Sequence, residues 1–372
     1  MTGVTYITTP KEKKAFLEFP YRHYKKDANW VPPLKFEVRK RLDTQKNPFF
    51  QQAEMALFLA EKDGEVAGRI AAIIDHRYNS YHNTQTGFFG FFESIDSDTV
   101  TDLLFRSASG WLEARGMETM MGPASPSMMD EVGILVDGFE KPPAIMMPYN
   151  KPWYGTLLEN AGLSKEMDLF AFDVDQSTVD RERMARAVGL VKRRIPGMNV
   201  RPIRLNKMQQ EVEIIRQIFN KAWSQNWGFI PLSKAELEQL ARDLKMILDP
   251  DFAHIVDVEG EPVAFSIALP DYNQILSDMN GTLFPTGLFK LLTRRKSIRR
   301  IRTALMGVLP EYRGKGIDAV LHHQSIENGL KRDFYSSELS WVLESNTEMV
   351  RVAERIGAIQ NKTYRIYSKS LR

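Results

Sequence analysis

The segment Gly307-Val308-Leu309-Pro310-Glu311-Tyr312-Arg313-Gly314-Lys315-Gly316-Ile317-Asp318 joins the end of an apolar strand, a basic turn with two glycines and the start of a helix. Gly314 and Gly316 let the backbone approach a bound group without interference from a Cβ atom. The free N–H groups at the start of the helix attract an anion, and Arg313 and Lys315 add positive charge. The segment therefore predicts a turn that binds a pyrophosphate.

Composition and length set the frame for this turn. The chain has 372 residues, of which 43% are hydrophobic and 26% charged, so we expect a globular protein of about two domains. The net charge of +3 is nearly balanced, so nucleic acid is not an expected partner. Cysteine is absent, which excludes disulfides, thiolate nucleophiles and cysteine-based zinc sites, and we predict no metal.

Two hairpins of the same kind occur in the two halves of the chain. Residues 55–62 and 65–75 are apolar and suited to strands, and Asp63-Gly64 between them is a strong turn signal. Residues 253–258 and 262–269 repeat the pattern around Glu259-Gly260. A duplicated fold is the simplest explanation, and the alternative is that two mixed halves share a rhythm by accident.

Further strands and helices are predicted in a similar order around each hairpin. The predicted strands are 87–93, 118–122, 165–174, 198–204, 302–309, 338–343 and 358–369. The predicted helices are 11–26, 34–42, 98–115, 207–223, 233–248, 316–331 and 347–356. The polar, basic composition of residues 177–197 predicts a helical connector. We therefore predict a first domain at 1–176, a connector at 177–197 and a second domain at 198–372.

The second half also contains Trp341-Val342-Leu343-Glu344-Ser345-Asn346 and Ala353-Glu354-Arg355-Ile356-Gly357-Ala358 after the turn. With these residues the chain resembles the GNAT superfamily of coenzyme A-dependent N-acyltransferases, and more narrowly a group of bacterial tandem-GNAT proteins. The resemblance implies an α/β (α+β) fold of two GNAT-like domains, each with a mixed, mostly antiparallel sheet flanked by helices. It is well supported over 198–369 and rests on element order alone over 55–174.

The resemblance implies a set of residues that bind acetyl-CoA or another acyl-CoA. The loop that holds the pyrophosphate of the cofactor corresponds to Arg313, Gly314, Lys315 and Gly316, with Ile317 beginning the helix. Asn346 corresponds to a residue that meets the pantetheine arm. Amides of the strand before the turn, which includes Val308, would pair with the pantetheine and polarise the thioester carbonyl as an oxyanion hole does.

Two residues depart from the family pattern. The loop ordinarily ends in Gly or Ala, but this chain has Asp318, which either caps the helix facing away from the ligand or weakens binding of CoA. We expect the cap. Many members carry a Tyr that protonates the departing thiolate, and the register puts Ala353 at that position. Tyr312, Tyr364 or a water molecule are the possible substitutes for this general acid.

Carboxylates and aromatic residues are the candidates for the acceptor side. We predict Glu344, at the end of a strand, as the general base and Asp271 as the second choice, while a surface ion pair and a turn-forming role are their alternative interpretations. The residues predicted to bind the acceptor are Trp223, Asn226, Trp227 and Phe229. The alternative interpretation is that these side chains only pack against the rest of the protein. His322 and His323 are expected to have packing or surface roles.

Residues 283–302 combine an apolar segment with a run of Arg and Lys. Such a segment can rest on an anionic membrane, bind an acyl chain or hold CoA phosphates, and a packed insertion with a solvated basic end is the simplest alternative. In the first half, the acidic stretch Ser94-Ile95-Asp96-Ser97-Asp98 stands where the phosphate turn would be. We therefore predict that the first domain is a degenerate copy that completes the core, shapes the acceptor cleft or forms a homodimer.

These inferences predict a cytoplasmic N-acyltransferase that moves an acyl group, expected to be acetyl, from acyl-CoA to a small-molecule or peptide amine. The amine would attack the thioester directly in a ternary complex, because no nucleophile supports a covalent relay. The rival functions are a silent acyl-CoA-binding or scaffold protein and a transferase that uses aminoacyl-tRNA.

Overall fold

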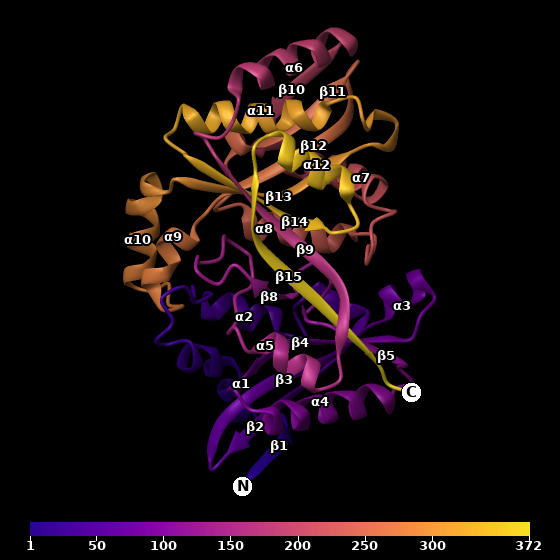
Figure 1. Cartoon of the computed structure of the whole chain (residues 1–372), viewed down its shortest axis with the longest axis vertical. Helices are drawn as coiled ribbons and strands as arrows, with labels where there is room; N and C mark the ends of the chain where they lie inside the picture. The colour runs from indigo at the N-terminus through magenta and orange to yellow at the C-terminus, as the bar shows by residue number, and fades with distance from the viewer. The chain divides into compact units, whose positions relative to one another are not determined.

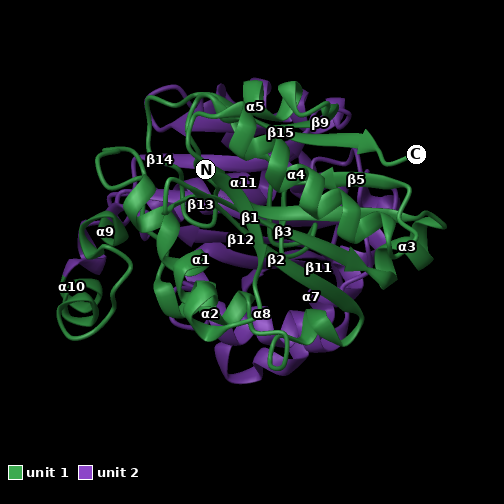
Figure 2. Ribbon diagram, turned by 90° about the horizontal axis from the view of Figure 1, so that it is seen from below, with its two compact units in different colours: residues 1–169, 275–293, 362–372 green, residues 170–274, 294–361 purple.

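The computed structural model describes residues 1–372, and the chain forms two compact units. Unit 1 comprises Met1–Leu169, Ile275–Thr293 and Lys362–Arg372, and unit 2 comprises Phe170–Gln274 and Arg294–Asn361 (Figure 2). These units are defined by packing in space, and each combines segments that are distant in the sequence. The domain boundaries at 176 and 197 stay a prediction.

Unit 1 contains a mostly antiparallel sheet with helices around it (Figure 1). Its strands are β1 (Thr2–Tyr6), β2 (Ala53–Lys62), β3 (Glu65–Asp75), β4 (Thr86–Ser94) and β5 (Thr119–Gly122), in that spatial order, with the short strands β6 (Ala124–Ser125), β7 (Glu131–Val132) and β8 (Ile134–Asp137). Strand β15 (Ile359–Ser370) pairs with β5 and β8. The helices are α1 (Pro10–His23), α2 (Lys35–Arg41), α3 (His76–His82), α4 (Asp98–Glu113) and α5 (Tyr154–Asn160), and most of α10 (Thr286–Arg294).

Unit 2 repeats this order of strands. They are β10 (Met198–Pro202), β11 (Ala253–Val258), β12 (Glu261–Pro270), β13 (Arg300–Val308) and β14 (Ser336–Leu343). Its helices are α6 (Arg181–Arg194), α7 (Met208–Ala222), α8 (Lys234–Leu244), α11 (Ile317–Leu330) and α12 (Thr347–Arg355). Strand β9 (Ser164–Asp175) and helix α9 (Asn273–Leu276) contribute residues to both units. The two units have the same succession of strand pairs, so the predicted tandem fold is confirmed.

The hairpin in each unit follows from its turn residues. Asp63 and Gly64 have φ angles of 53° and 84°, and Glu259 and Gly260 have 53° and 87°. Two successive positive φ angles produce a two-residue turn whose twist matches that of paired strands. Both predicted hairpins are therefore present, with strands β2–β3 and β11–β12.

One parallel pair of strands occurs at the same place in each unit. Strand β4 pairs with β5 in parallel only over residues 86–88, and β13 pairs with β14 in parallel only over residues 300–303. Beyond these residues the strands of each pair separate. A parallel pair that diverges leaves a wedge between the two strands, and a cavity lies at this position in each unit.

Strand β1 and helix α3 are two of the elements that were not expected from the sequence. Strand β1 pairs with β2 along the edge of its sheet, and its polar Thr and Gly residues provide little hydrophobic pattern. Helix α3 is short and begins at Asp75, whose side chain accepts hydrogen bonds from the N–H groups of Arg77 and Tyr78. Because this cap is the main local signal, the helix is hard to distinguish from a turn. The predicted connector 177–197 does contain a helix, α6.

Candidate functional site

A cavity of about 380 Å³ lies in the wedge between β13 and β14 of unit 2. Residues 303–308 of β13 line one side and residues 339–343 of β14 line the other. The loop after α7, the turn before α11 and the first turns of α12 complete the lining. The strand edges, two helix starts and an aromatic loop therefore converge on one site.

Where strand β13 lines the cavity, it is paired with another strand on one of its two edges. It pairs with β12 along residues 301–308, so the backbone groups that face β12 are used in the sheet. The groups on the other side have no β14 partner after Thr303. One of them, the carbonyl oxygen of Met306, accepts a hydrogen bond of 2.9 Å from the indole Nε1 of Trp223. The remaining strand edge is suited to an extended ligand that hydrogen-bonds as a strand does.

The turn before α11 has the conformation that its glycines predict. Gly314 and Gly316 have φ angles of 68° and 86°, which glycine adopts without strain. Gly316 is the N-cap residue of α11, and no side chain caps the first N–H groups. A Cβ atom on Gly314 would have no neighbour within 4 Å, whereas one on Gly316 would lie 2.7 Å from Cγ2 of Val191. The helix start is therefore open toward Gly314 and closed behind Gly316.

Not every residue of the predicted phosphate loop lines the cavity. Val308, Arg313 and Gly314 do, and a guanidinium N–H of Arg313 donates to the carbonyl oxygen of Ala222. Lys315 is exposed, with its ammonium 4.8 Å from the centre of the Tyr312 ring, so it supplies charge from the rim. Ile317 is 1% exposed and anchors the helix in the core. These four side chains fit the separate tasks of contacting, attracting and supporting an anion.

The expected cap by Asp318 is wrong. The N-cap residue is Gly316, and Asp318 instead lines the cavity from the first turn of α11. The reason is the left-handed conformation of Gly316, which starts the helix two residues before Asp318 and leaves its side chain no N–H to cap. A carboxylate therefore faces the region where a phosphate would bind, and the two negative charges would repel each other.

His322 lies one turn further along α11 and also lines the cavity. Its ring is 4% exposed, its Nε2 atom has no hydrogen-bond partner in the protein, and burial lowers its pKa while Asp318 opposes this shift. A neutral imidazole with an unsatisfied nitrogen at a cavity wall is suited to a polar ligand atom. The sequence pattern predicted only a packing or surface role for this residue.

The residues predicted for the pantetheine and the acceptor are brought together with one exception. Asn346 lines the cavity and caps α12, because its side chain accepts a hydrogen bond of 3.1 Å from the N–H of Met349. Trp223, Asn226 and Trp227 also line the cavity. Phe229 does not: it is 3% exposed and packs against Phe219 with the ring centres 5.8 Å apart.

Neither predicted base lines the cavity. Asp271 is 3% exposed, and its carboxylate lies 3.9 Å from Arg300, which also bonds Glu338 at 2.7 Å. This buried charge cluster lies where β13 and β14 are still paired. Glu344 is half-buried and directly precedes the lining residues at the end of β14. Both roles stay predictions, and the sequence pattern overlooked Glu348, an exposed carboxylate of α12 that does line the cavity.

The absence of a Tyr at position 353 has a structural reason. Ala353 is 1% exposed and belongs to a hydrophobic cluster with Val342 and Met184, so a phenol ring there would overfill the core. The neighbouring Val352 faces the cavity instead. Tyr312, one of the proposed substitutes, lines the cavity from the other side.

Unit 1 contains a second cavity, of about 130 Å³, in the corresponding place. Its buried carboxyl group, Glu93 of β4, accepts hydrogen bonds from the hydroxyls of Tyr24 at 2.5 Å and Tyr154 at 2.7 Å. Arg69 lies 3.5 Å from the same carboxyl group. Burial raises the pKa of Glu93, while the Arg69 charge and the tyrosine hydrogen bonds oppose the shift. The sequence pattern did not predict this network.

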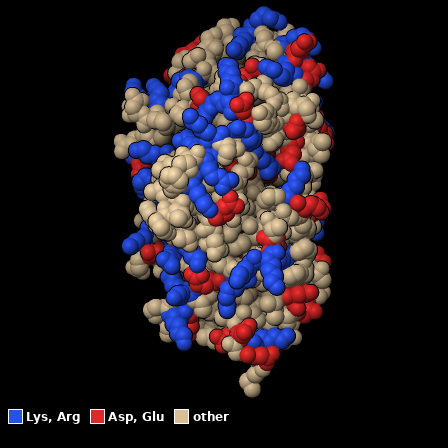
Figure 3. Space-filling model, turned by 90° about the vertical axis from the view of Figure 1, so that its left-hand side faces the viewer, with Lys and Arg blue, Asp and Glu red and all other residues tan.

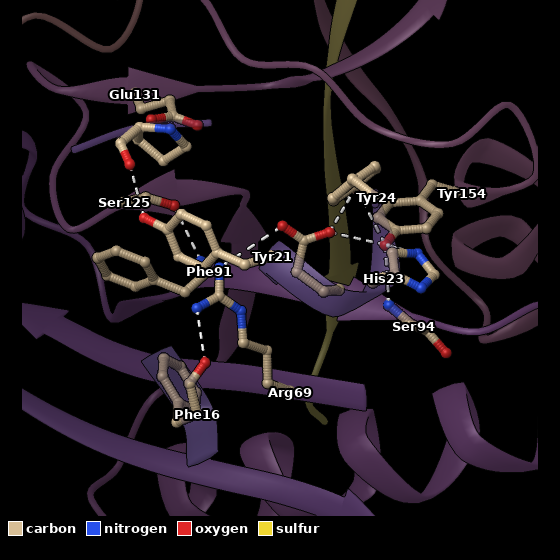
Figure 4. A network of polar contacts seen from close by, with 12 residues as sticks. Phe16, Tyr21, His23, Tyr24, Arg69, Phe91, Ser94, Ser125, Glu131 and Tyr154 are labelled. Atoms are coloured by element: carbon tan, nitrogen blue, oxygen red, sulfur yellow. Dashed lines mark hydrogen bonds and ion pairs between the residues drawn. The ribbon is translucent and has the colours of Figure 1, made fainter. Parts of the chain in front are cut away.

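The network continues through Tyr154 to Ser94 and His23, and through Arg69 to Phe16 (Figure 4). The Tyr154 hydroxyl accepts from the N–H of Ser94 at 3.0 Å and lies 3.1 Å from Nε2 of His23, whose pKa is lowered to about 4 by burial and nearby positive charge. On the other side Arg69 donates to the carbonyl oxygen of Phe16 at 2.9 Å. The polar groups of this cavity therefore bond mainly to one another.

The helix start in unit 1 differs from that in unit 2. Helix α4 begins at Asp98, and the side chain of Ser97 accepts from the N–H of Val100. A protein side chain thus already bonds one of the N–H groups that α11 leaves open. Across both units, no group of three or more His, Asp or Glu side chains is placed to hold a metal ion.

The sequence of the chain is similar to those of two known bacterial proteins. No family model matches the chain. The chain is 37% identical over 373 residues to the bacterial ceramide synthase of Caulobacter vibrioides, covering 98% of this chain and 96% of that protein. It is 36% identical over 365 residues to protein YghO of Escherichia coli, covering 96% and 93%. The chain belongs to the family of these two proteins.

The fold of this family is that of the tandem GNAT proteins. A tandem GNAT protein from the clavulanic acid biosynthesis pathway superposes with a TM-score of 0.57 and 10% identity, covering 100% of this chain and 99% of that structure. At this identity the likeness concerns the fold alone. It agrees with the duplicated strand order.

Proposed function

We propose that the chain is an acyl-CoA-dependent N-acyltransferase whose acceptor is the amino group of a long-chain amino alcohol. The observation that carries the proposal is the open phosphate turn beside the wedge of unit 2, in a chain related over nearly its whole length to a ceramide synthase. A ceramide is the amide of such an amino alcohol and a fatty acid. The proposal therefore extends the predicted acetyl donor to longer acyl groups.

The residues of unit 2 fit an acyl-CoA. The N–H groups at the start of α11 and Arg313 would hold the pyrophosphate. The free edge of β13 would pair with the pantetheine and place an N–H group at the thioester oxygen, where it stabilises developing negative charge. Trp223, which is fixed by its bond to Met306, would form the wall beside the thioester.

The transfer step would take place in one cavity. The amine nitrogen attacks the carbonyl carbon of the thioester, the C–N bond forms, and the C–S bond breaks. The ammonium form of the acceptor loses one proton to become the nucleophile, and the attacking amine loses another, which balances the protonation of the thiolate. We propose Glu344 as the group that receives a proton, with Glu348 as the alternative because it lines the cavity.

The proposal is tested by incubating the protein with long-chain amino alcohol and acyl-CoAs from acetyl to palmitoyl and detecting the amide by mass spectrometry. We expect an amide and one free thiol per amide, and loss of both in Gly314→Asp, which puts a carboxylate into the open side of the turn. Binding of acyl-CoA without any amide would support the silent-binding rival. Failure of all acyl-CoAs to bind would contradict the proposal.

A general base is tested separately from binding. Glu344→Gln and Glu348→Gln each keep the shape of the side chain but cannot accept the proton. The variant that removes the base should lower kcat about a hundredfold or more with little change in the affinity for acyl-CoA. The same measurement on Asp271→Asn is complicated by its ion pair with Arg300, so its folded fraction has to be measured as well.

A further inference from the structure

Apart from Met1, the first residue of the chain, the most exposed large apolar side chains of unit 1 lie on and just before α10. Phe284, Phe289 and Leu292 are 67%, 70% and 72% exposed, which is unusual for large apolar residues so near one another. Elsewhere Met246 is as exposed, at 72%, but it stands alone. We call Phe284, Phe289 and Leu292 the apolar ridge.

The ridge is presented by a helix that is packed on its other side. A Cβ atom on Gly287 would lie 2.4 Å from the Cε atom of Met279 and 2.6 Å from the carbonyl oxygen of Thr282, so this face has no free space. The ammonium of Lys290 donates to the carbonyl oxygen of Asp278 at 3.0 Å. Phe289 and Leu292, three residues apart, share the outward face. Their exposure therefore does not come from a loose loop.

The segment also attaches to the wall of the unit 1 cavity. A Cβ atom on Gly281 would lie 2.5 Å from the ring of Tyr21 and 2.7 Å from the carbonyl oxygen of Pro33, and the Gly281 carbonyl accepts a hydrogen bond from the N–H of Lys35 at 2.9 Å. Tyr21 and Pro33 both line that cavity. The ridge and this cavity wall thus belong to one packed body.

Positively charged residues occur within the segment of the apolar ridge and directly after it. Lys290 lies within α10, Arg294 ends it, and exposed Arg295 and Lys296 follow directly. No acidic residue occurs between Asp278 and Glu311. Lys and Arg side chains are numerous on the face that carries α10, with uncharged surface among them (Figure 3). A ridge with this charge complements an anionic surface.

We propose that α10 and Phe284 dock unit 1 onto the surface of an anionic lipid bilayer. Phe284, Phe289 and Leu292 enter the boundary between head groups and acyl chains, and the cations of the segment bind lipid phosphates. None of the helices is long and apolar enough to cross a bilayer, so the contact is interfacial. This inference goes beyond the proposed transfer reaction. Docking on the bilayer would bring the enzyme to a water-insoluble amine acceptor.

The test is sedimentation of the full chain with vesicles of phosphatidylcholine alone or mixed in equal parts with phosphatidylglycerol. We expect binding to the anionic vesicles, weakened by salt. Phe289→Ser with Leu292→Ser should weaken it about a hundredfold, since each apolar side chain is worth about tenfold at the interface. Met246→Ser, which removes an equally exposed apolar side chain, should leave binding unchanged.

The charges are tested in the same assay. Arg295→Gln and Lys296→Gln should each weaken binding about fivefold, and Arg186→Gln, an exposed Arg of α6, should not. Thermal melting confirms that each variant is folded. Equal binding to neutral and anionic vesicles would overturn the proposal. So would a dimer, seen by ultracentrifugation, that the ridge variants dissociate, because a second copy would then cover the ridge.

Docking and transfer can fail independently of each other. The sedimentation contains neither acyl-CoA nor amine, so it does not depend on the reaction. Transfer to a water-soluble, short-chain amino alcohol requires no membrane. A ridge variant that keeps this transfer but loses transfer to a long-chain acceptor in vesicles supports docking, and one that loses neither contradicts it.

Discussion

The two units carry the same wedge between parallel strands but fill it in different ways. In unit 2 the edge of β13 has no β14 partner after Thr303, no side chain caps the start of α11, and the Nε2 atom of His322 has no hydrogen-bond partner in the protein. In unit 1 the carboxyl group of Glu93 is bonded by Tyr24 and Tyr154, and Ser97 caps the helix that follows. The polar groups around the smaller cavity of unit 1 thus bond to the protein's own side chains, whereas those of the larger cavity in unit 2 are left more open.

In unit 1 a strand of the protein also lies in the wedge, close to the edge of β4. A Cβ atom on Gly90 of β4 would lie 1.9 Å from the carbonyl oxygen of Ala124, so β6 occupies the space beside β4. In unit 2 the corresponding edge of β13 faces the larger cavity. In the proposed complex the pantetheine would pair with this edge of β13, whereas the corresponding edge in unit 1 is occupied by β6.

The largest effect is expected from placing one negative charge at each helix start. Gly314→Asp meets no neighbouring atom at its Cβ but strains the backbone at a φ of 68°, and it should weaken binding of acyl-CoA about a hundredfold or more through this strain and through repulsion of the pyrophosphate. Ser97→Asp keeps a good N-cap in unit 1 and should leave affinity unchanged. Calorimetry on both variants checks this. Equal losses would show that the two units do not differ as described.

A smaller effect is expected from opening the network of unit 1. Glu93→Ala removes the acceptor of two buried tyrosine hydroxyls and should lower the free energy of unfolding by about 2–4 kcal/mol. The affinity of unit 2 for acyl-CoA should not change. Urea unfolding and calorimetry measure the two quantities, and a stable variant with lost affinity would contradict the structural role of Glu93.

Removing the charge of Asp318 should strengthen the binding of CoA, in contrast to adding a charge at Gly314. Asp318→Asn eliminates a carboxylate that faces the phosphate region and should tighten binding of CoA about tenfold, or about 1.4 kcal/mol. Glu311→Gln, an exposed carboxylate before the turn, is the matched control with a smaller change. Weaker binding by Asp318→Asn would show that this carboxylate contacts another part of the ligand favourably.

An effect of similar size to that at Asp318 concerns pH and a histidine of lowered pKa in each unit. Burial lowers the pKa of His23 and of His254 to about 4, with nearby positive charge contributing at His23. A neutral histidine in the fold contributes stability that is present above pH 6.5 and is lost as the pH falls through 4. His254→Gln should reduce this acid loss by about 1–2 kcal/mol. Unfolding measured from pH 7 to pH 4 tests it, and an unchanged profile would contradict it.

The sequence was sufficient for the parts of the fold that have local signals. Asp63-Gly64 and Glu259-Gly260 determine their hairpins by backbone conformation, and Gly314 and Gly316 determine the phosphate turn. The start of the helix near Gly316 was also predicted, but Gly316 takes the N-cap position and Asp318 is the second residue of the helix, so its predicted role as the cap was wrong. Local chemistry predicts such turns but not which helix residue then faces a cavity.

Residues that meet only in three dimensions could not be predicted. Glu93, Tyr24 and Tyr154 are far apart in the sequence, and none of them has a local pattern of its own. Strand β15, near the end of the chain, completes the sheet of unit 1, which no linear division into two halves anticipates. His322 is similar, since a histidine on a helix looks the same whether its nitrogen meets water, protein or a cavity.

The comparison of the two wedges is tested most directly by hydrogen exchange of the full chain with and without acyl-CoA. We expect the ligand to slow exchange in 303–318 and 339–346 of unit 2. We expect no change in 86–98 and 119–126 of unit 1. Protection of the unit 1 segments, or of neither set, would contradict the claim that unit 2 alone holds the acyl-CoA.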